Sequence, residues 1–247
     1  MFKTVLILFL TFSINAIADK TTLLTQGKAI NSDGKLVYIE QHESVINEGK
    51  LYKLTTNYLD AKGKQFGHIK TDYSLNSGIP NYEFIDNRNG RFVSVELQDK
   101  KVIAKTKTKK DEPKETNTYD LESNMVAGQG LYAFLYNNLE KFIQNSDHIE
   151  NVLFLIPLNE DTYKFRIRKL KKDNDIITLR LEADSWFFRL IAPHIDVTYN
   201  MINKKLLKYE GPSNLLSESG EAMNVSISYT DRENKDLKTG IKEARND

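Results

Sequence analysis

The sequence predicts a mainly β protein, in which a curved antiparallel sheet forms an open barrel or half-barrel with one helix packed on its concave face. Three observations predict this fold. Apolar and polar residues alternate with period two along most of the chain, as in strands that have one face in water. Short turns rich in Asn, Asp and Gly separate these segments. One central segment, residues 128–145, changes to helical periodicity.

The first 18 residues have the three parts of a secretory signal peptide. Lys3 gives a positive start, residues 5–12 are almost wholly apolar, and residues 16–18 (AIA) form a cleavage site of the A-x-A type. The apolar run is shorter than the roughly 18 residues that a membrane-spanning helix needs. We therefore expect cleavage after Ala18, a mature chain in the bacterial periplasm, and no transmembrane anchor once the signal is removed.

The composition excludes several classes of function. The chain has no cysteine, which excludes disulfides, a thiol nucleophile, a thiolate metal site and a lipid-modified cysteine. Its 35 Lys+Arg and 34 Asp+Glu nearly cancel, whereas nucleic-acid-binding proteins usually carry a strong basic excess. No P-loop, dinucleotide fingerprint or calcium-loop spacing occurs. We therefore expect no nucleic-acid partner and no cofactor.

Residues 19–247 are expected to form a single β-rich domain of about a dozen short strands, most of them joined by hairpins. The clearest alternation occurs in residues 52–59, 162–170, 176–183, 194–201 and 223–229. The clearest hairpin turns are residues 31–35, 47–50, 60–64 and 87–91. Strands and helices do not alternate along the chain, which argues against a parallel sheet.

Residues 105–117 (KTKTKKDEPKETN) form a charged segment without apolar residues. They could be a basic patch for phosphate or lipid headgroups, or a solvated hairpin end or linker. Acidic residues directly follow the lysines, which favours the second interpretation.

The helix is expected at about residues 130–145. At about 100° per residue its apolar side chains fill an arc of roughly 140°. These side chains are Leu131, Tyr132, Leu135, Tyr136, Leu139, Phe142 and Ile143. In a water-soluble chain such a face must be covered, so we expect the helix to lie across the curved sheet. Leu135 and Leu139 are expected to face the sheet, and Tyr132 or Tyr136 to lie nearer an opening, where a phenol reaches water.

The sequence contains no catalytic or metal-binding motif. Of the four histidines (His42, His68, His148 and His194), His194 is the candidate, because Asp196 follows on the same strand face. This pair could act as a weak metal site or acid–base pair, but a polar strand face explains it more simply. Ser185 lies upstream, yet no G-x-S-x-G surrounds it. The prediction is therefore no catalytic residue and no metal ligand.

Two segments are apolar on both faces: VLFLIP at 152–157 and SWFFRLIAP at 185–193. Strands of this kind are covered on both sides, by simple core packing or by a ligand. If a cavity lies between sheet and helix, its expected lining consists of aromatic side chains. The candidates are Tyr132, Tyr136, Phe165, Trp186, Phe188 and Tyr199.

The segments YKLTTNYLDAKGKQFGHIKTDYS and YNMINKKLLKYEGPSNL resemble a group of exported bacterial proteins whose domain has no assigned function. The resemblance spans most of residues 22–230, and its motifs are turn and strand residues. The expected architecture is more distantly similar to the half-barrels of periplasmic lipoprotein carriers, which hold acyl chains in an apolar cavity. No residue of those carriers can be matched to a position of this sequence, so the similarity concerns architecture alone.

Three functions follow as expectations. The first is a periplasmic, non-enzymatic binding or carrier protein for an apolar ligand, such as a lipid or a lipoprotein acyl chain. The second is an envelope assembly or interaction protein, without a ligand cavity, that binds another envelope protein. The third is a hydrolase that acts on envelope material through His194 and Asp196.

Overall fold

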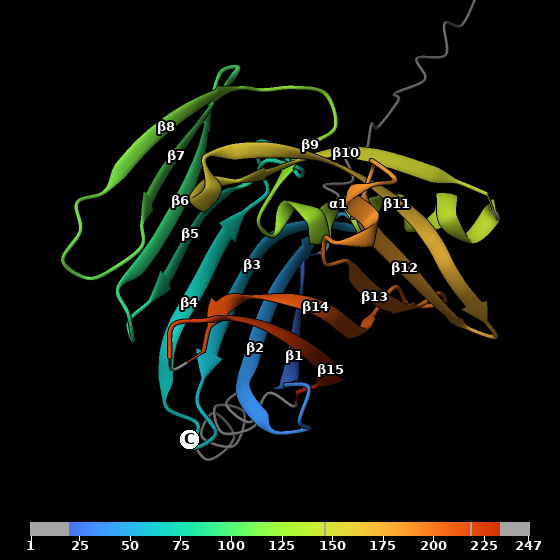
Figure 1. The fold of residues 1–247 in the computed structure, drawn as a ribbon. Coiled ribbons are helices and arrows are strands. Elements are labelled where there is room, and N and C mark those ends of the chain that lie inside the picture. The colour runs from blue at the N-terminus through green and yellow to red at the C-terminus, as the bar shows by residue number, and fades with distance from the viewer. Residues whose placement is uncertain (1–19, 146, 218, 233–247) are drawn as a thin grey trace, which may run out of the picture.

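A computed structural model describes residues 20–145, 147–217 and 219–232. The predicted signal peptide lies outside these residues, so cleavage after Ala18 and the periplasmic location stay predictions. Fifteen strands of the described residues form one curved sheet that is not closed into a barrel (Figure 1). The predicted mainly β fold, an open antiparallel sheet with one helix on its concave face, is confirmed.

The sheet is built outward from the two ends of the described chain. β1 (Lys20–Ile30) pairs antiparallel with β15 (Ala222–Asp231), and these two strands lie in the middle of the strand order. β8 (Glu115–Asp120) and β9 (Met125–Ala127) lie at its two edges. We call β1–β8 the first wing and β9–β15 the second wing.

Within each wing nearly every strand pairs with its neighbour in sequence. The first wing also contains β2 (Leu36–Asn47), β3 (Lys50–Leu59), β4 (Gln65–Asp72), β5 (Asn81–Asp86), β6 (Arg91–Gln98) and β7 (Lys101–Lys107). The second wing also contains β10 (Ile149–Ile156), β11 (Asp161–Asp173), β12 (Ile176–Ala183), β13 (Ile195–Asn200) and β14 (Leu206–Leu216).

The hairpin turns form where the sequence predicts them. Gly34, Gly49, Gly63 and Gly90 all have positive φ, between 73° and 83°, and glycine adopts this conformation without strain. The charged segment is a hairpin end: β7 stops at Lys107 and β8 starts at Glu115, with exposed residues between them. This arrangement matches the solvated-hairpin interpretation.

The helix α1 (Gly130–Gln144) connects the only parallel neighbours among the described strands. β9 pairs parallel with β10, with Val126 opposite Phe154. Parallel neighbours need a crossover of a dozen or more residues, usually a helix, whereas antiparallel neighbours need only a tight turn. The sequence predicted antiparallel pairing throughout. This parallel pair was not predicted, because β9 has three residues and is too short to show a period.

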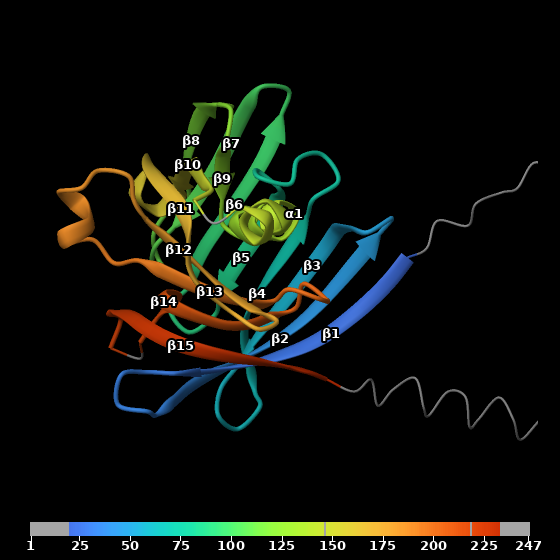
Figure 2. The same cartoon turned by 90° about the vertical axis from the view of Figure 1, so that its right-hand side faces the viewer.

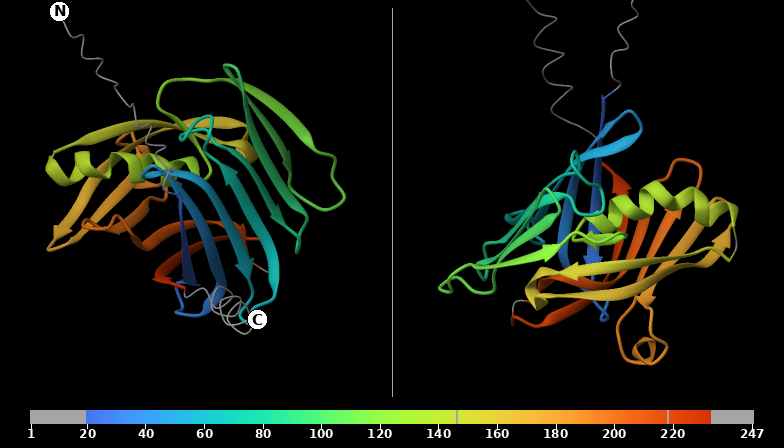
Figure 3. Two further views of the ribbon diagram at one scale, coloured as in Figure 1. Left: turned by 180° about the vertical axis from the view of Figure 1, so that it is seen from behind. Right: turned by 90° about the horizontal axis from the view of Figure 1, so that it is seen from above.

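The apolar face of α1 packs on the inner face of the second wing. Leu131, Leu135, Leu139 and Phe142 are buried in one cluster with side chains of β10–β13. In Figure 2 the helix is seen end-on between the two wings, and in Figure 3 it runs across the strands of the second wing. The alternation predicted for residues 176–183 is confirmed by the burial of Ile177, Leu179, Leu181 and Ala183.

Residues 185–193 correct one expectation. They do not form a strand covered on both sides: β12 ends at Ala183, and a 3-10 turn, η2 (Phe188–Leu190), follows. The side chain of Arg189 folds back and donates to the carbonyls of Ala183 and Asp184, which closes the loop. The run is apolar but lacks alternation, so neither of its faces can be assigned to a sheet. Figure 3 shows this loop projecting from the second wing.

Candidate functional site: a cavity between the sheet and the helix

A cavity of about 1170 Å³ lies between the inner faces of the two wings and α1. It is larger than the roughly 300–1,000 Å³ that is usual for small-molecule sites. Most of its lining is apolar, and the α1 side contributes Leu131, Leu135, Tyr132 and Tyr136. The helix therefore completes the core on one flank and walls the cavity on another.

The first wing contributes a row of polar side chains. On β2, Tyr38, Glu40, His42 and Ser44 all line the cavity, because alternate residues of a strand face the same way. Glu40 is only 5% exposed, and Tyr38 only 1%. Inner faces are usually apolar, and buried polar groups such as these need hydrogen-bond partners.

Glu40 and His42 of this row belong to a longer chain of hydrogen bonds. Thr71 donates to the Gln129 side-chain oxygen (2.5 Å), and the Gln129 side-chain nitrogen donates to Thr56 Oγ1 (2.9 Å). Thr56 Oγ1 lies 2.9 Å from His42 Nδ1, and His42 Nε2 lies 2.9 Å from Glu40 Oε2. Gln129 directly precedes α1. Its side chain takes part in these hydrogen bonds and does not cap the helix.

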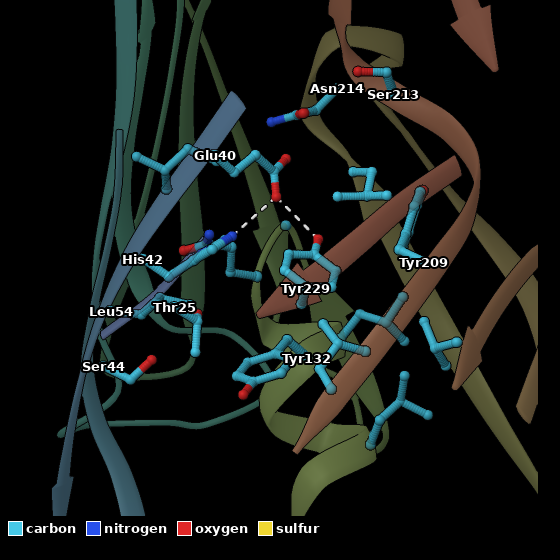
Figure 4. A pocket seen from close by; sticks show the side chains of 18 of the residues that line it. Thr25, Glu40, His42, Ser44, Leu54, Tyr132, Tyr209, Ser213, Asn214 and Tyr229 are labelled. Carbon is cyan, nitrogen blue, oxygen red and sulfur yellow. Dashed lines mark hydrogen bonds and ion pairs between the residues drawn. The ribbon is translucent and has the colours of Figure 1, made fainter. Parts of the chain in front are cut away.

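Glu40 receives a second hydrogen bond from the opposite side of the cavity. Tyr229 on β15 donates its hydroxyl to Glu40 Oε2 at 2.9 Å. Figure 4 shows both bonds meeting at the same carboxylate oxygen. Burial raises the pKa of Tyr229 well above the usual phenol value, and the charge of Glu40 raises it further. Tyr229 therefore keeps its proton and donates a hydrogen bond to Glu40 throughout the physiological pH range.

Two more tyrosines hold the bend of β14 against the first wing. Tyr38 Oη is 2.9 Å from Ser213 Oγ, and the side-chain nitrogen of Asn214 donates to Tyr58 Oη at 2.7 Å. The strand register shifts between Pro212 and Leu216, which turns these polar side chains toward the cavity (Figure 4).

The structure divides the six predicted lining residues. Tyr132, Tyr136 and Tyr199 line the cavity. Burial raises the pKa of Tyr132 to about 12. Tyr199 is fully buried, and its hydroxyl has no hydrogen-bond partner among the described residues.

The other three residues lie elsewhere. Phe165 is half-buried and stacks edge-on with Phe154, which does line the cavity. Trp186 and Phe188 are surface residues, 70% and 55% exposed. Their placement corrects the expectation, because a loop that projects from the sheet cannot reach its inner face.

His194 and Asp196 do not form an isolated acid–base pair. Two hydrogen bonds of 2.7 Å tie Asp196 to Arg180, and His194 Nε2 stands 3.7 Å from the same carboxylate. The pair is a polar strand face, which is the simpler of the two interpretations. His148 similarly contacts Glu150 at 2.9 Å, outside the cavity.

Sequence reasoning missed the polar centre of the cavity. Glu40-Gln41-His42 has the same two-residue spacing as His194-Ile195-Asp196, so it could have been singled out by the same rule. What distinguishes the first pair is that it replaces the apolar residues expected on an inward face. That substitution is visible only once β2 is known to face inward.

Comparisons with known proteins add little to this site. No protein-family model matches the chain, and no curated protein matches it. Among solved structures it is similar to a beta-barrel-like protein of the domain of unknown function DUF1849 from Brucella abortus. That match covers 87% of this chain and 98% of the other, at 10% sequence identity and a TM-score of 0.38. The likeness is to a β-rich domain without an assigned function and carries no argument about ligands. The similarity to lipoprotein carriers stays a prediction.

Proposed function

We propose that the protein binds an apolar or amphiphilic ligand, such as a lipid or a lipoprotein acyl chain, in the cavity between the two wings. The observation that carries the proposal is the cavity itself, with about 1170 Å³ of space and a largely apolar lining. A well-packed protein core normally has few voids larger than a water molecule, so this space is not ordinary core. Burial of an alkyl chain there contributes about 0.8 kcal/mol for each CH₂ group.

Two measurements test the proposal. Native mass spectrometry of protein purified without denaturant should show added mass from a co-purified ligand. Titration with the neutral fluorescent probe N-phenyl-1-naphthylamine should show saturable binding. Ser44→Phe, which places a ring in the cavity from β2, should weaken probe binding at least about tenfold. Ten-fold corresponds to about 1.4 kcal/mol.

The matched control is Thr55→Phe, on the neighbouring strand β3. Ser44 pairs with Leu54, which lines the cavity, whereas the next residue, Thr55, is absent from the lining and points the other way. Thr55→Phe should leave probe affinity unchanged. A parent protein that binds no probe and carries no added mass would end the proposal.

A second candidate function is binding to an envelope partner through the loop at residues 185–193, which we call the aromatic loop. Trp186, Phe187, Leu190 and Ile191 are 56–74% exposed. Contiguous exposed apolar side chains of this kind mark interaction sites. This candidate does not exclude the first, because the loop and the cavity share no residue.

Trp186 is the only tryptophan of the chain, so its fluorescence reports on the aromatic loop alone. The emission should be that of an indole in water. It should shift to shorter wavelength when a partner covers the loop, and stay unchanged when the probe fills the cavity. An emission shift caused by the probe in the cavity would contradict the separation of the two surfaces.

The hydrolase receives little support from this geometry. Glu40, His42 and Thr56 do form a carboxylate–imidazole–hydroxyl series. Thr56, however, is fully buried, does not line the cavity, and accepts a hydrogen bond from Gln129. A nucleophile must reach the substrate, and this hydroxyl does not.

A further inference from the structure

Glu40 is a buried carboxylate without a lysine or arginine partner among the described residues. Its side-chain contacts are hydrogen bonds with His42 and Tyr229. Both bonds end on Oε2, and no described residue donates to Oε1. Other buried acids of this chain have fixed cations: Asp86 has Arg88, and Glu182 has Arg166 and Arg168. Glu40 is therefore the exception.

The contacts of Thr56 fit an imidazole that accepts at Nδ1. Thr56 Oγ1 already accepts from Gln129, so its own proton must go to another acceptor. His42 Nδ1, 2.9 Å away, is the acceptor that the described contacts provide. A ring that accepts at Nδ1 donates at Nε2, here to Glu40. A neutral imidazole orients the carboxylate but does not cancel its charge.

Four tyrosines share the cavity with this carboxylate. Tyr38, Tyr58, Tyr209 and Tyr229 all line the cavity. Burial raises the pKa of each of these phenols, and the charge of Glu40 raises it further. Tyrosine rings around a carboxylate are a favourable surrounding for an ammonium group, because ring faces attract cations.

A buried charge costs several kcal/mol unless an opposite charge compensates it. For Glu40 the described side chains supply hydrogen bonds but no cation. We propose that the ligand supplies it: the cavity takes an amphiphile whose protonated amine or quaternary ammonium group contacts Glu40, with its apolar chain extending toward α1. This proposal rests on the proposed function and specifies its ligand class.

The positive side chains that line the cavity have other contacts. Arg91 donates to the carbonyl of Asn214, and Arg232 to the side chain of Gln41. Lys204 pairs with Glu140, and Lys205 with Asp231. An anionic head would have to draw on Arg91 or Arg232, whose hydrogen bonds within the described part of the chain go to a carbonyl and an amide. The experiment therefore compares both signs of charge.

The experiment displaces N-phenyl-1-naphthylamine with three twelve-carbon amphiphiles, each kept below its micelle concentration. Dodecyltrimethylammonium is cationic, dodecanol neutral and dodecanoate anionic. With the parent protein, the cation should displace the probe at a concentration at least about tenfold below that of dodecanol. Glu40→Gln should remove this advantage, so that the cation and dodecanol displace the probe at similar concentrations. Glu43→Gln, the same change at an exposed position of β2, should have no effect.

The selectivity of the parent protein tests the proposal even if Glu40→Gln does not fold, and Glu40→Asp retains the charge as a second variant. Equal displacement by all three amphiphiles, or a preference for dodecanoate, would overturn the assignment of a cationic head while the proposed function stands. Failure of the probe to bind the parent protein would instead remove the proposed function. The two failures are therefore distinguishable.

Discussion

At the scale of single residues, Glu182 shows how this fold stabilises an acid that has its own cations. Its carboxylate accepts from Arg166 at 2.6 and 2.8 Å and from Arg168 at 3.0 Å, across the β11–β12 pair. Burial opposes the charged form, but the bonds from Arg168 and Arg166 outweigh it, and the pKa of Glu182 is lowered below 4.5. The ionised form is therefore more stable in the folded chain than in the unfolded one.

This lowered pKa predicts a pH-dependent stability. The contribution of Glu182 is fully present above pH 4.5 and is lost as the pH falls through the lower folded pKa. Glu182→Gln should reduce the free energy of unfolding by about 2 kcal/mol at pH 7, as loss of hydrogen bonds to a charged group does. Urea unfolding at pH 7 and pH 3 should show the deficit shrinking at the lower pH. Glu43→Gln is the control and should change the free energy of unfolding little at either pH. A deficit of equal size at both pH values for Glu182→Gln would contradict this account.

The residue scale is also where sequence reasoning reached least far. Tyr132, Tyr136 and Tyr199 were predictable as cavity-lining residues because aromatic side chains on an inward face follow from periodicity. Glu40 and His42 were not, because their roles come from Tyr229 on β15 and Thr56 on β3. Hydrogen bonds between strands distant in sequence depend on register, and no local pattern encodes register across the wings.

At the scale of elements, α1 has one flank in the core and one on the cavity. Leu139 is fully buried against the second wing and is absent from the cavity lining, whereas Tyr136 is half-buried and lines the cavity. The position of the helix was predictable from its period. Its role as a crossover between parallel strands was not, since β9 is too short to be recognised.

This division predicts opposite effects of two alanine variants. Leu139→Ala should lower the free energy of unfolding by about 2–5 kcal/mol, as buried leucines do, without a change in probe affinity. Tyr136→Ala should lower the free energy of unfolding by less but weaken probe binding, because Tyr136 lines the cavity. Thermal melts and probe titrations on both variants make the comparison. Equal stability losses with unchanged binding would mean that α1 is purely a core element.

At the scale of the whole molecule, we expect the middle of the sheet to resist local unfolding more than its edges. β1 pairs with both β2 and β15, and the seam between the wings contains the fully buried Ala29 and the buried Ile227. β8 lies at an edge, where every residue is exposed or only half-buried. Both features follow from a strand order that no hairpin count could supply: the predicted hairpins define neighbours, but not which two strands join the wings.

Hydrogen exchange should reveal this gradient. The hydrogen-bonded amides of β1 and β15 should exchange only through global unfolding, and those of β8 through local fraying. In low denaturant, the seam amides should share one opening free energy, several kcal/mol above that of β8. The opposite order, with the seam opening first, would mean that the wings are independently stable and only loosely joined.

The same seam governs the order in which the molecule can assemble. Thr25 pairs with Asp231, a partner more than 200 positions further along the chain, whereas most other strand pairs are hairpins that close over a few residues. Long-range closure is slow because the entropy of the intervening loop must be paid first. Single hairpins of each wing can therefore form early, but neither wing is stable until β1 and β15 pair. The cavity draws its lining from both wings, so it does not exist in any half-folded form. A ligand can therefore bind only after the last strand has paired.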